Sequence, residues 1–241
     1  MWGGLDAAPQ KGRGMRRGSM EERQTDAGAS IVFANVTKRF GAHTVIHGLT
    51  RTVRGGCITA VTGINGSGKS TFLKLAAHLI MPEEGAVHVA IDGEEVRRAA
   101  LRAKIALVTP ELRFYARLTA WENLAFVLGA RGKKLTKEGY EALLGRVGLA
   151  REKTGGMRVE GYSTGMRQRL KLAALFGTDA RIWLLDEPGA NLDEAGREMV
   201  RAEARAAAGR GTLVLWATND AGEEAEADET IRLAGHLPRL S

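Results

Sequence analysis

The sequence has little of what a secreted or membrane-spanning protein needs. Cys57 is the only cysteine among 241 residues, so no internal disulfide can form. The longest apolar runs, such as residues 182–185, fall far short of the roughly 18 apolar residues of a membrane-spanning helix. The start of the chain also lacks the apolar core of a secretory signal. We therefore expect a soluble protein in a reducing, cytoplasmic setting.

The sequence also shows no internal repeat, which excludes a tandem duplication. A chain of 241 residues with 44% hydrophobic composition can bury one substantial core. Residues 1–30 are rich in Gly, Arg, Gln and Asp and have no apolar periodicity, so we expect a disordered tail there. The remaining chain is expected to form one domain over residues 31–235, followed by a short tail over 236–241.

The positive charge is concentrated in one stretch. Residues 131–171 contain eleven basic and four acidic side chains, and this excess of seven equals the whole net charge of +7. A basic lobe of this kind can meet phosphate, nucleic acid, anionic lipid headgroups or an acidic partner surface. A solvated helix face explains the same charges equally well.

From residue 31 onward, patterns typical of strands and of helices alternate. The uninterrupted run 57–62 indicates a buried central strand, and the apolar stripe over 70–80 indicates a helix. The stretch from about 115 to 177 indicates an inserted helical lobe. Further strands are expected at 31–33, 49–53, 86–91, 104–108, 182–185, 212–217 and 229–233, and further helices at 195–208 and 223–227. This alternation predicts a parallel α/β core.

One segment carries a phosphate-binding pattern. Gly63-Ile-Asn-Gly-Ser-Gly-Lys-Ser70 fits G-x-x-x-x-G-K-[ST] and lies between a predicted strand and a predicted helix. Its glycines allow successive N–H groups to point at an anion, and the helix dipole adds positive charge. Lys69 would contact the terminal phosphates, and the Ser70 hydroxyl would bind Mg²⁺. The candidate nucleotide-binding residues are Gly63, Asn65, Gly66, Ser67, Gly68, Lys69, Ser70 and Thr71. A glycine-rich turn with an incidental lysine is the alternative, which the strand and helix around it disfavour.

Two adjacent carboxylates follow the predicted strand 182–185. A buried strand can end in Asp186 and Glu187 only if a cation or a proton compensates their charge. Ligands of α/β sheets bind beyond the carboxyl ends of strands, so Asp186 lies near Gly63 if the two strands are neighbours. We expect Asp186 to face Mg²⁺ and Glu187 to activate the attacking water. An ordinary strand end with a solvated Asp-Glu pair is the alternative.

A third segment points to a particular family. Tyr162-Ser-Thr-Gly-Met-Arg-Gln-Arg-Leu170 resembles the ABC signature L-S-G-G-Q and its basic helix, although Thr164 and Met166 depart from the consensus. In that family Ser163 and Gly165 would complete the ATP site of a partner subunit, so that each ATP lies between two subunits. In isolation, a helix that is capped by a serine and binds no ligand would explain the segment.

Two further segments resemble the same family. Residues 189–193 resemble its D-loop, in which Asp193 would help communication across a dimer, although a plain helix cap also explains Asp193. Residues 37–41 resemble the segment whose aromatic residue stacks on adenine, which would be Phe40; a core-packing phenylalanine is as good an explanation. The resemblance runs from about residue 31 to 233 and implies an ABC ATPase fold with a parallel core, an antiparallel β-subdomain and an inserted helical lobe.

The chain departs from the family at two places. The family has a glutamine at the end of the strand before the helical lobe, whereas Pro110 and Glu111 stand here. Glu111 is a candidate for the water-mediated metal contact, and an ordinary surface glutamate is the alternative. The family has a histidine where Asn219 stands, and an asparagine cannot carry a proton. Because Glu187 remains, we expect slow but real hydrolysis.

The resemblance implies an ATP-hydrolysing subunit of an ABC transporter, with ATP and Mg²⁺ as cofactors. It would act as a homodimer or heterodimer, power a separate membrane permease, and lie in the cytoplasm at the inner face of the membrane. Residues 118–124 resemble exporter-type ATPases, including the haem-exporter-like branch. No nucleic acid is expected as a partner. The alternatives are an ABC ATPase that acts on nucleic acid or ribosomes through its basic lobe, and an ATP-binding regulatory module.

Overall fold

The computed structural model describes residues 28–150 and 156–234. The predicted tail at residues 1–30 lies outside the described residues except for its last three, and the tail at 236–241 lies outside them entirely. Ala29 and Ser30 already belong to the first strand, β1 (Ala29–Phe40), which therefore begins two residues before the predicted position 31. The side chain of Ala29 is buried, which explains why the strand starts there.

The strands form two sheets, one antiparallel and one parallel. The antiparallel sheet has the order β2-β1-β4-β5 and consists of β2 (His43–Arg54), β1, β4 (Glu84–Ile91) and β5 (Glu94–Glu95). The parallel sheet has the order β6-β7-β8-β3-β9 and consists of β6 (Ile105–Val108), β7 (Ile182–Asp186), β8 (Leu213–Ala217), β3 (Ile58–Thr62) and β9 (Glu229–Arg232). The predicted parallel core and antiparallel subdomain are both confirmed.

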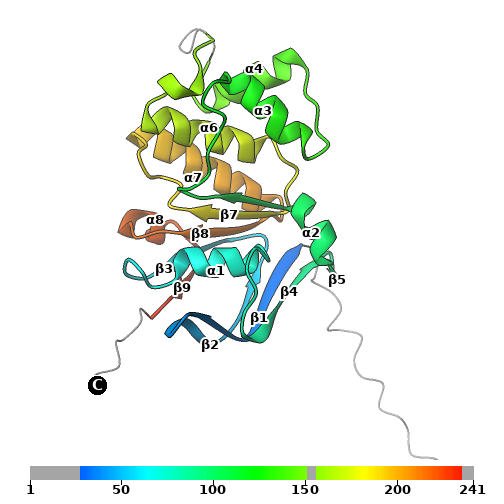
Figure 1. Ribbon diagram of the computed structural model, residues 1–241, viewed down its shortest axis with the longest axis vertical. Helices are drawn as coiled ribbons and strands as arrows, with labels where there is room; N and C mark the ends of the chain where they lie inside the picture. The colour runs from blue at the N-terminus through cyan, green and yellow to red at the C-terminus, as the bar shows by residue number, and fades with distance from the viewer. Residues whose placement is uncertain (1–27, 151–155, 235–241) are drawn as a thin grey trace, which may run out of the picture.

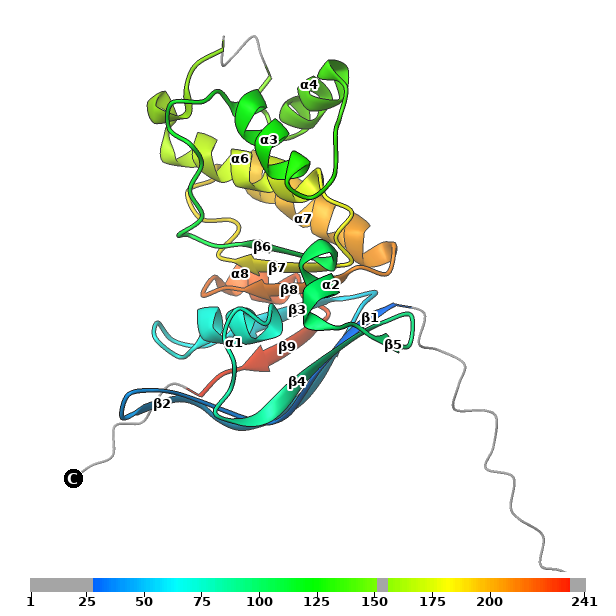
Figure 2. The ribbon, with the colours of Figure 1, turned by 45° about the vertical axis from the view of Figure 1, so that its right-hand side comes forward.

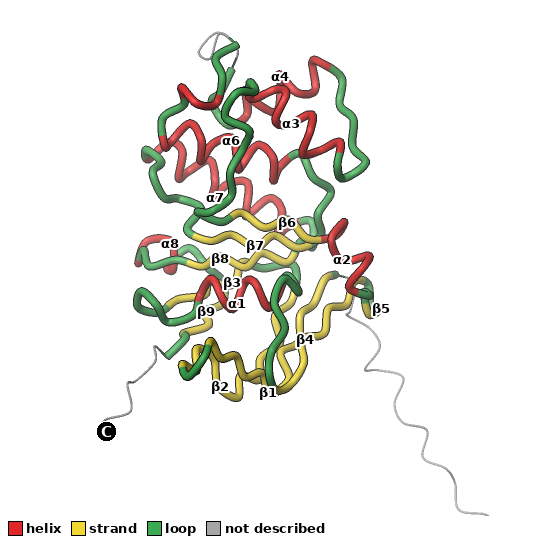
Figure 3. The backbone as a smooth tube through the Cα atoms, viewed as in Figure 1, coloured by secondary structure: helices red, strands yellow, loops and turns green. Residues whose placement is uncertain are grey.

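Helices cover both faces of the parallel sheet (Figure 1). They are α1 (Lys69–Ala76), α2 (Arg98–Lys104), α3 (Ala120–Gly129), α4 (Lys137–Arg146), α6 (Thr164–Phe176), α7 (Glu194–Gly209) and α8 (Ala221–Ala225), with a 3₁₀ turn at Val159–Gly161. The figure shows α6 and α7 on one side of the sheet, and α1 with the antiparallel sheet on the other. Figure 3 shows the same layers, with α3, α4 and α6 grouped at one end as the predicted helical lobe.

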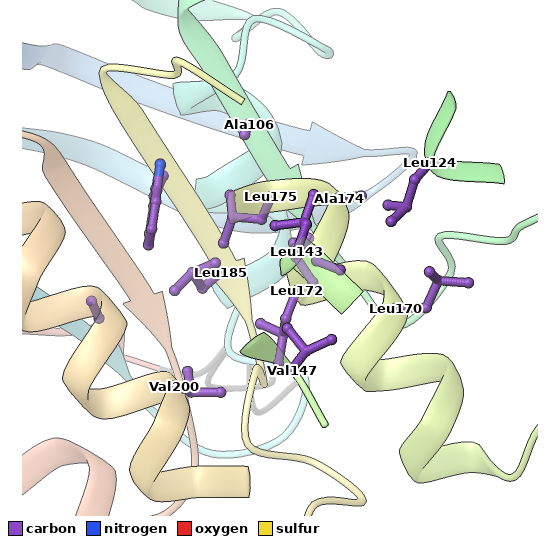
Figure 4. Packing of buried hydrophobic residues seen from close by; sticks show 14 of the residues in the cluster. Ala106, Leu124, Leu143, Val147, Leu170, Leu172, Ala174, Leu175, Leu185 and Val200 are labelled. Carbon is purple, nitrogen blue, oxygen red and sulfur yellow. The ribbon is translucent and has the colours of Figure 1, made fainter. Parts of the chain in front are cut away.

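The two layers have separate hydrophobic cores because side chains of a strand alternate between its faces. Along β7, Trp183 and Leu185 face the core beneath α6 and α7, where Leu185 lies beside Leu172 and Leu175 of α6 (Figure 4). Ile182 and Leu184 face the opposite core, in which the ring of Phe33 from β1 stacks on Phe72 of α1 with centroids 4.4 Å apart. The alternation fixes the sheet between the lobe on one side and α1 on the other.

Six basic side chains of the stretch 131–171 form hydrogen bonds or ion pairs within the molecule. Most of these side chains reach backbone carbonyl groups at the ends of neighbouring elements. Arg131 donates to the carbonyls of Ala103 and Ile105, Lys133 to that of Gly177, Arg167 to that of Glu160, Arg169 to that of Val147, and Lys171 to those of Thr109 and Pro110. Arg146 forms an ion pair with Glu203 of α7. Arg131, Arg146 and Lys171 join the lobe to the sheet domain. The basic side chains that are exposed are Lys134, Lys137, Arg146, Arg158 and Arg167, so much of the described stretch is a solvated surface. Arg151 and Lys153 lie outside the described residues.

Candidate nucleotide site

The glycine-rich loop of residues 63–68 lies between β3 and α1, as the sequence predicts. Gly63 has a φ of 147°, and a Cβ there would lie 2.5 Å from the Ser67 hydroxyl oxygen. Gly68 has a φ of 100°, and a Cβ there would lie 2.7 Å from a methyl carbon of Val45 in β2. Both positions therefore need glycine, for conformation and for space. The loop is held closely against the β1–β2 hairpin.

The buried side chain of Lys69, the first residue of α1, extends into this loop. Its Nζ donates to the carbonyl oxygens of Gly63 at 2.8 Å and Ile64 at 3.2 Å, and to Oδ1 of Asn219 at 2.6 Å. An ammonium group has three hydrogens, so its donors are all engaged. The buried hydroxyl oxygen of Ser67 has no hydrogen-bond partner within the described part of the chain. The loop thus holds a positive charge and an unpaired polar atom, and an anion there would take over at least one bond of Lys69.

Asp186 is the buried carboxylate at the end of β7, only 3% exposed. Burial raises the pKa of its carboxyl group, the hydrogen bond from Ser70 of α1 lowers it, and the nearby carboxylates of Glu187 and Glu111 raise it further. Its Oδ2 has no hydrogen-bond partner among the described residues. A buried carboxylate with a free oxygen beside a hydroxyl group fits a hard divalent cation such as Mg²⁺, because such a cation binds oxygen ligands and compensates the charge. Thr71 follows Ser70 in the first turn of α1.

Asp186 lies near the glycine-rich loop, but not because the two strands that precede them are neighbours. Strands β7 and β3 are not neighbours, because β8 lies between them. Asp186 reaches Ser70 because α1 packs across both β7 and β8. The intervening strand contributes a third loop to the site, and this loop carries Asn219.

Asn219 joins the three loops. Its amide nitrogen donates to Oδ1 of Asn65 at 2.6 Å and to Oε1 of Glu187 at 3.3 Å, while its amide oxygen accepts from Lys69. Glu187 lies in the left-handed region with a φ of 50°, and its N–H donates to the carbonyl of Ala217 at 2.9 Å. A non-glycine residue in that conformation costs on the order of 1–3 kcal/mol and occurs often at functional sites. The sequence-predicted residues Asn65, Lys69, Glu187 and Asn219 therefore form one cluster.

Glu111 is exposed and lies in the loop that follows β6. Its own backbone N–H and the Thr109 hydroxyl lower the pKa of its carboxyl group. The charge of Glu111 contributes to the raised pKa of Asp186, so the two carboxylates lie near each other. A neighbouring cleft is lined by Pro110, Lys171, Asp186 and Glu187, among others. Glu111 therefore lies on the Asp186 side of the site, although no hydrogen bond joins them among the described residues.

The Ser163 segment lies apart from the glycine-rich loop of its own chain. Ser163 is exposed and caps α6, where its hydroxyl oxygen accepts from the N–H of Met166 at 3.2 Å. Gly165 lies against the loop 189–193, since a Cβ there would be 2.8 Å from the carbonyl oxygen of Asn191. In the described structure, no hydrogen bond links Ser163 or Gly165 to residues 63–68.

Asp193 and Phe40 take different places. Asp193 caps α7, accepts from the N–H of Gly196 at 2.9 Å and pairs with Arg169 at 2.5 Å; these two contacts lower the pKa of its carboxyl group. It therefore has the helix-cap role that was the alternative.

Phe40 is 50% exposed at the end of β1, with Nζ of Lys38 5.0 Å from its ring centroid, so it is not a core residue. Figure 2 shows the β1–β2 turn on the same side of the molecule as the loop before α1.

Sequence reasoning missed Glu223 at the edge of the site. Its Oε2 accepts from Nε1 of Trp216 at 3.0 Å and from the Thr218 hydroxyl at 2.5 Å. Its Oε1 lies 2.0 Å from where a Cβ of Gly189 would be, so the side chain fills the space that glycine leaves. Glu223 thus connects the loop of Asn219 with the loop 189–193. It lies in the short, acidic α8, where no sequence pattern distinguishes it from its neighbours.

The parallel sheet, the glycine-rich loop before α1 and the carboxylate at the end of β7 define an α/β domain of the P-loop class. The family model described as ABC transporter matches residues 46–190, which is more than half of the chain. The chain therefore belongs to the ABC transporter family, as its motifs predict.

The relatives that are similar to this chain include ATP-binding proteins named for import and for bacitracin transport. The Fe(3+) ions import ATP-binding protein FbpC of Brucella melitensis is 34% identical over 209 residues, which cover 84% of this chain and 57% of FbpC. The bacitracin transport ATP-binding protein BcrA of Enterococcus faecalis is 34% identical over 167 residues, which cover 69% of this chain and 53% of BcrA. The chain thus spans little more than half the length of these curated relatives.

A solved structure supports the fold. The structure titled as a putative ABC transporter (ATP-binding protein) from Pyrococcus furiosus superposes with a TM-score of 0.72 at 20% identity, covering 85% of this chain and 97% of the other. Among the residues that the structure describes, no helix has both the length and the apolar composition of a membrane span.

Proposed function

We propose that this chain binds and hydrolyses ATP and thereby powers a separate membrane permease. The observation that carries the proposal is the convergence of Lys69, Asp186, Glu187 and Asn219 from three loops at one edge of the sheet. A buried cation that can contact phosphate, a buried carboxylate beside a hydroxyl group and a second carboxylate are the groups that phosphoryl transfer to water requires.

Each residue in this cluster has a distinct proposed task. The backbone N–H groups of residues 63–71 and the Lys69 ammonium bind the phosphates, and Asn65 orients Asn219 through the 2.6 Å hydrogen bond. Ser70 and Asp186 hold Mg²⁺, which supplies charge compensation to the phosphate oxygens when bound. Glu187 accepts the proton of the attacking water. Asn219 can donate a hydrogen bond to the terminal phosphate but cannot carry a proton, so turnover is slow.

The exposed Ser163 at the N-terminus of α6 supports a dimer. A helix N-terminus with a serine cap is suited to an anion, and Ser163 forms no hydrogen bond with its own glycine-rich loop in the described structure. We propose that it contacts the ATP held by the loop of a second subunit, identical or different. Phe40 would stack on the adenine, because half of its surface is free. Asp193 would act across the dimer by fixing the position of the loop 189–193.

The helical lobe offers a surface for the permease. Four large apolar side chains of this region, Tyr115, Trp121, Phe126 and Met157, are each 43–56% exposed. Trp121 and Met157 also line a cavity of about 320 Å³ with Lys137 and Glu141. Exposed apolar clusters with a polar rim are typical of protein interfaces. We propose that this surface binds the permease, which places the chain in the cytoplasm at the inner face of the membrane.

The alternative of a nucleic-acid partner finds less support. A surface that binds phosphate needs free cations, whereas Arg131, Lys133 and Lys171 donate to carbonyl groups of the same chain. ATPase activity that nucleic acid stimulates and salt suppresses would favour that alternative instead.

The proposal is tested with Glu187→Gln. Removal of the proton acceptor should leave ATP binding intact and stop turnover, so that ATP holds the subunits together as a stable dimer in size-exclusion chromatography with light scattering. Glu198→Gln on the exposed face of α7 is the matched control and should stay monomeric after turnover. Lys69→Ala should bind ATP weakly and form no dimer. If two identical subunits share the site, a Glu187→Gln chain should dimerise by itself. A Glu187→Gln chain that remains monomeric at every concentration with saturating ATP contradicts a site shared by two copies of this chain.

A further inference from the structure

Lys171 is a buried lysine that the proposed hydrolysis does not use. It lies in the middle of α6 and is only 7% exposed. Its Nζ donates to the carbonyl oxygen of Thr109 at 2.8 Å and to that of Pro110 at 3.0 Å. Both acceptors belong to the loop that follows β6 and contains Glu111. A lysine is rarely buried unless its charge is compensated, so these two bonds account for its position.

The loop after β6 also has hydrogen-bond donors of its own. The N–H of Leu112 donates to the carbonyl oxygen of Thr109 at 3.2 Å, and the guanidinium of Arg113 donates to that of Pro110. Strand β6 is the edge strand of the parallel sheet, and its pairing with β7 ends at Val108 and Leu185. The carbonyl groups of Thr109 and Pro110 lie beyond that pairing. Lys171 adds a further hydrogen bond to each of these carbonyl groups, and unlike Leu112 and Arg113 it belongs to the helical lobe. Its two bonds therefore link the loop to α6 rather than satisfy an otherwise unpaired group.

A second buried side chain of α6 contacts the other side of the site. Gln168 lies three residues before Lys171, so the two share one face of the helix. Its Nε2 donates to the carbonyl oxygen of Pro188 at 2.9 Å, directly after Glu187. The helix that begins after Ser163 is therefore tied to both loops that flank Asp186 and Glu187. The distance from Ser163 to Lys171 along the helix is about 12 Å.

We propose that Lys171 is a positioning residue. It fixes Glu111 relative to Asp186, and it makes Glu111 move when the helical lobe moves. The inference rests on the proposed function, since it describes how the same site would sense a partner bound to the lobe. A displacement of α6 by a permease or by a second subunit moves the loop 109–111 through the two bonds of Lys171. The charge of Glu111 then moves with respect to the Asp186 carboxylate and the cation it would hold. The buried charge of Lys171 also offsets that of Glu111 nearby.

Hydrogen exchange of the full nucleotide-free chain tests the link itself. In Lys171→Met, the loop amides within residues 109–113, above all that of Leu112, which donates to the carbonyl oxygen of Thr109 at 3.2 Å, should exchange about tenfold faster or more than in the unaltered chain. Lys133→Met is the matched control, because Lys133 also comes from the lobe and donates to a carbonyl, that of Gly177, away from Asp186. It should leave the loop unchanged. If Lys171→Met does not fold, Lys171→Leu serves, since leucine also carries no hydrogen-bond donor. Unchanged exchange of 109–113 in the folded variant overturns the proposal.

The Mg²⁺ dependence tests the consequence. Lys171→Met should raise the Mg²⁺ concentration for half-maximal ATPase activity on the order of tenfold, while the affinity for ATP in EDTA changes less than about twofold, because residues 63–71 are untouched. In a Glu111→Ala background, Lys171→Met should cause no further shift, since its effect passes through Glu111. An additive shift in the double variant contradicts this route. A chain that binds no ATP at all would overturn the proposed function and leave the exchange result standing.

Discussion

At the scale of single residues, Asn219 is the side chain at the centre of the site. A histidine at this place could share a proton or a positive charge with a terminal phosphate, whereas the asparagine amide only donates and accepts hydrogen bonds. Its contacts with Lys69, Asn65 and Glu187 show that the substitution does not leave a gap, because the amide links all three. The local geometry is kept and the capacity to carry charge is lost.

This position of Asn219 predicts opposite changes in kcat for two replacements. Asn219→Ala removes the amide that faces Glu187 and should lower kcat on the order of tenfold or more, with little change in KM for ATP. Asn219→His should raise kcat, since a histidine can carry positive charge near the developing negative charge. Steady-state ATPase assays at saturating Mg²⁺ measure both variants. An ATPase rate that Asn219→Ala leaves unchanged removes Asn219 from the mechanism.

Asp186 makes stability depend on pH. Burial raises the pKa of its carboxyl group above the ordinary value. The folded chain therefore binds the proton more tightly than the unfolded chain does, and stability falls as the pH rises through the interval between the unfolded and folded pKa values. Asp186→Asn removes this charge, so the cation-free variant should have a higher Tm than the unaltered chain at pH 7. The difference should shrink as the pH falls through the raised pKa.

Thermal unfolding in EDTA across pH 4 to about 8 measures this effect. Asp179→Asn is the control, because Asp179 is exposed and pairs with Lys133 at the surface. It should show no gain at pH 7. An Asp186→Asn variant that is less stable than the unaltered chain at pH 7 contradicts the uncompensated burial of the carboxylate.

At the scale of elements, the pattern of apolar and polar residues determined which helices and strands the sequence could predict. Strands β3, β7 and β8 are buried along their whole length and stand out as apolar runs. Helix α2 gave no signal because Leu101 is its only buried residue. Helix α1 ends at Ala76, four residues before the predicted end, because His78 takes a φ of 52° and breaks the helix. Strands β1 and β2 each run for 12 residues. Exposed polar positions conceal most of β2, whereas in β1 the polar residues Asn35, Thr37 and Lys38 interrupt the apolar pattern although Thr37 and Lys38 are buried.

The same limits applied to the site. The glycine-rich loop and the Asp186-Glu187 pair are contiguous patterns with a strand beside them, so the sequence was sufficient to predict them. Lys171 and Glu223 act through backbone carbonyls and glycine-lined space that only the folded chain creates. Nothing in an isolated lysine or glutamate indicates such a partner.

At the scale of the whole molecule, the exposed apolar side chains of the helical lobe predict an interface. Phe126 is 54% exposed and its ring lies edge-on to Tyr115, with centroids 5.1 Å apart. Phe126→Ala together with Trp121→Ala should weaken binding to the permease by about tenfold or more, as removal of aromatic anchors does at interfaces. The basal ATPase activity of the isolated chain should not change. Co-purification with a tagged polytopic membrane protein from the same cells measures the loss.

Ile64→Ala is the control, because Ile64 is 73% exposed but lies in the glycine-rich loop rather than on the lobe. It should retain the permease. Equal retention by the double variant of the lobe would show that the permease binds elsewhere.

The sequence by itself determined the fold class, the glycine-rich loop and the carboxylate pair, because each is encoded in residues that are neighbours along the chain. Only the tertiary structure decided that β8 separates β7 from β3, that Asn219 bridges Lys69 and Glu187, and that Lys171 holds the loop of Glu111. These contacts join residues that are distant in sequence, and their geometry follows from strand order and helix packing, which no local pattern specifies.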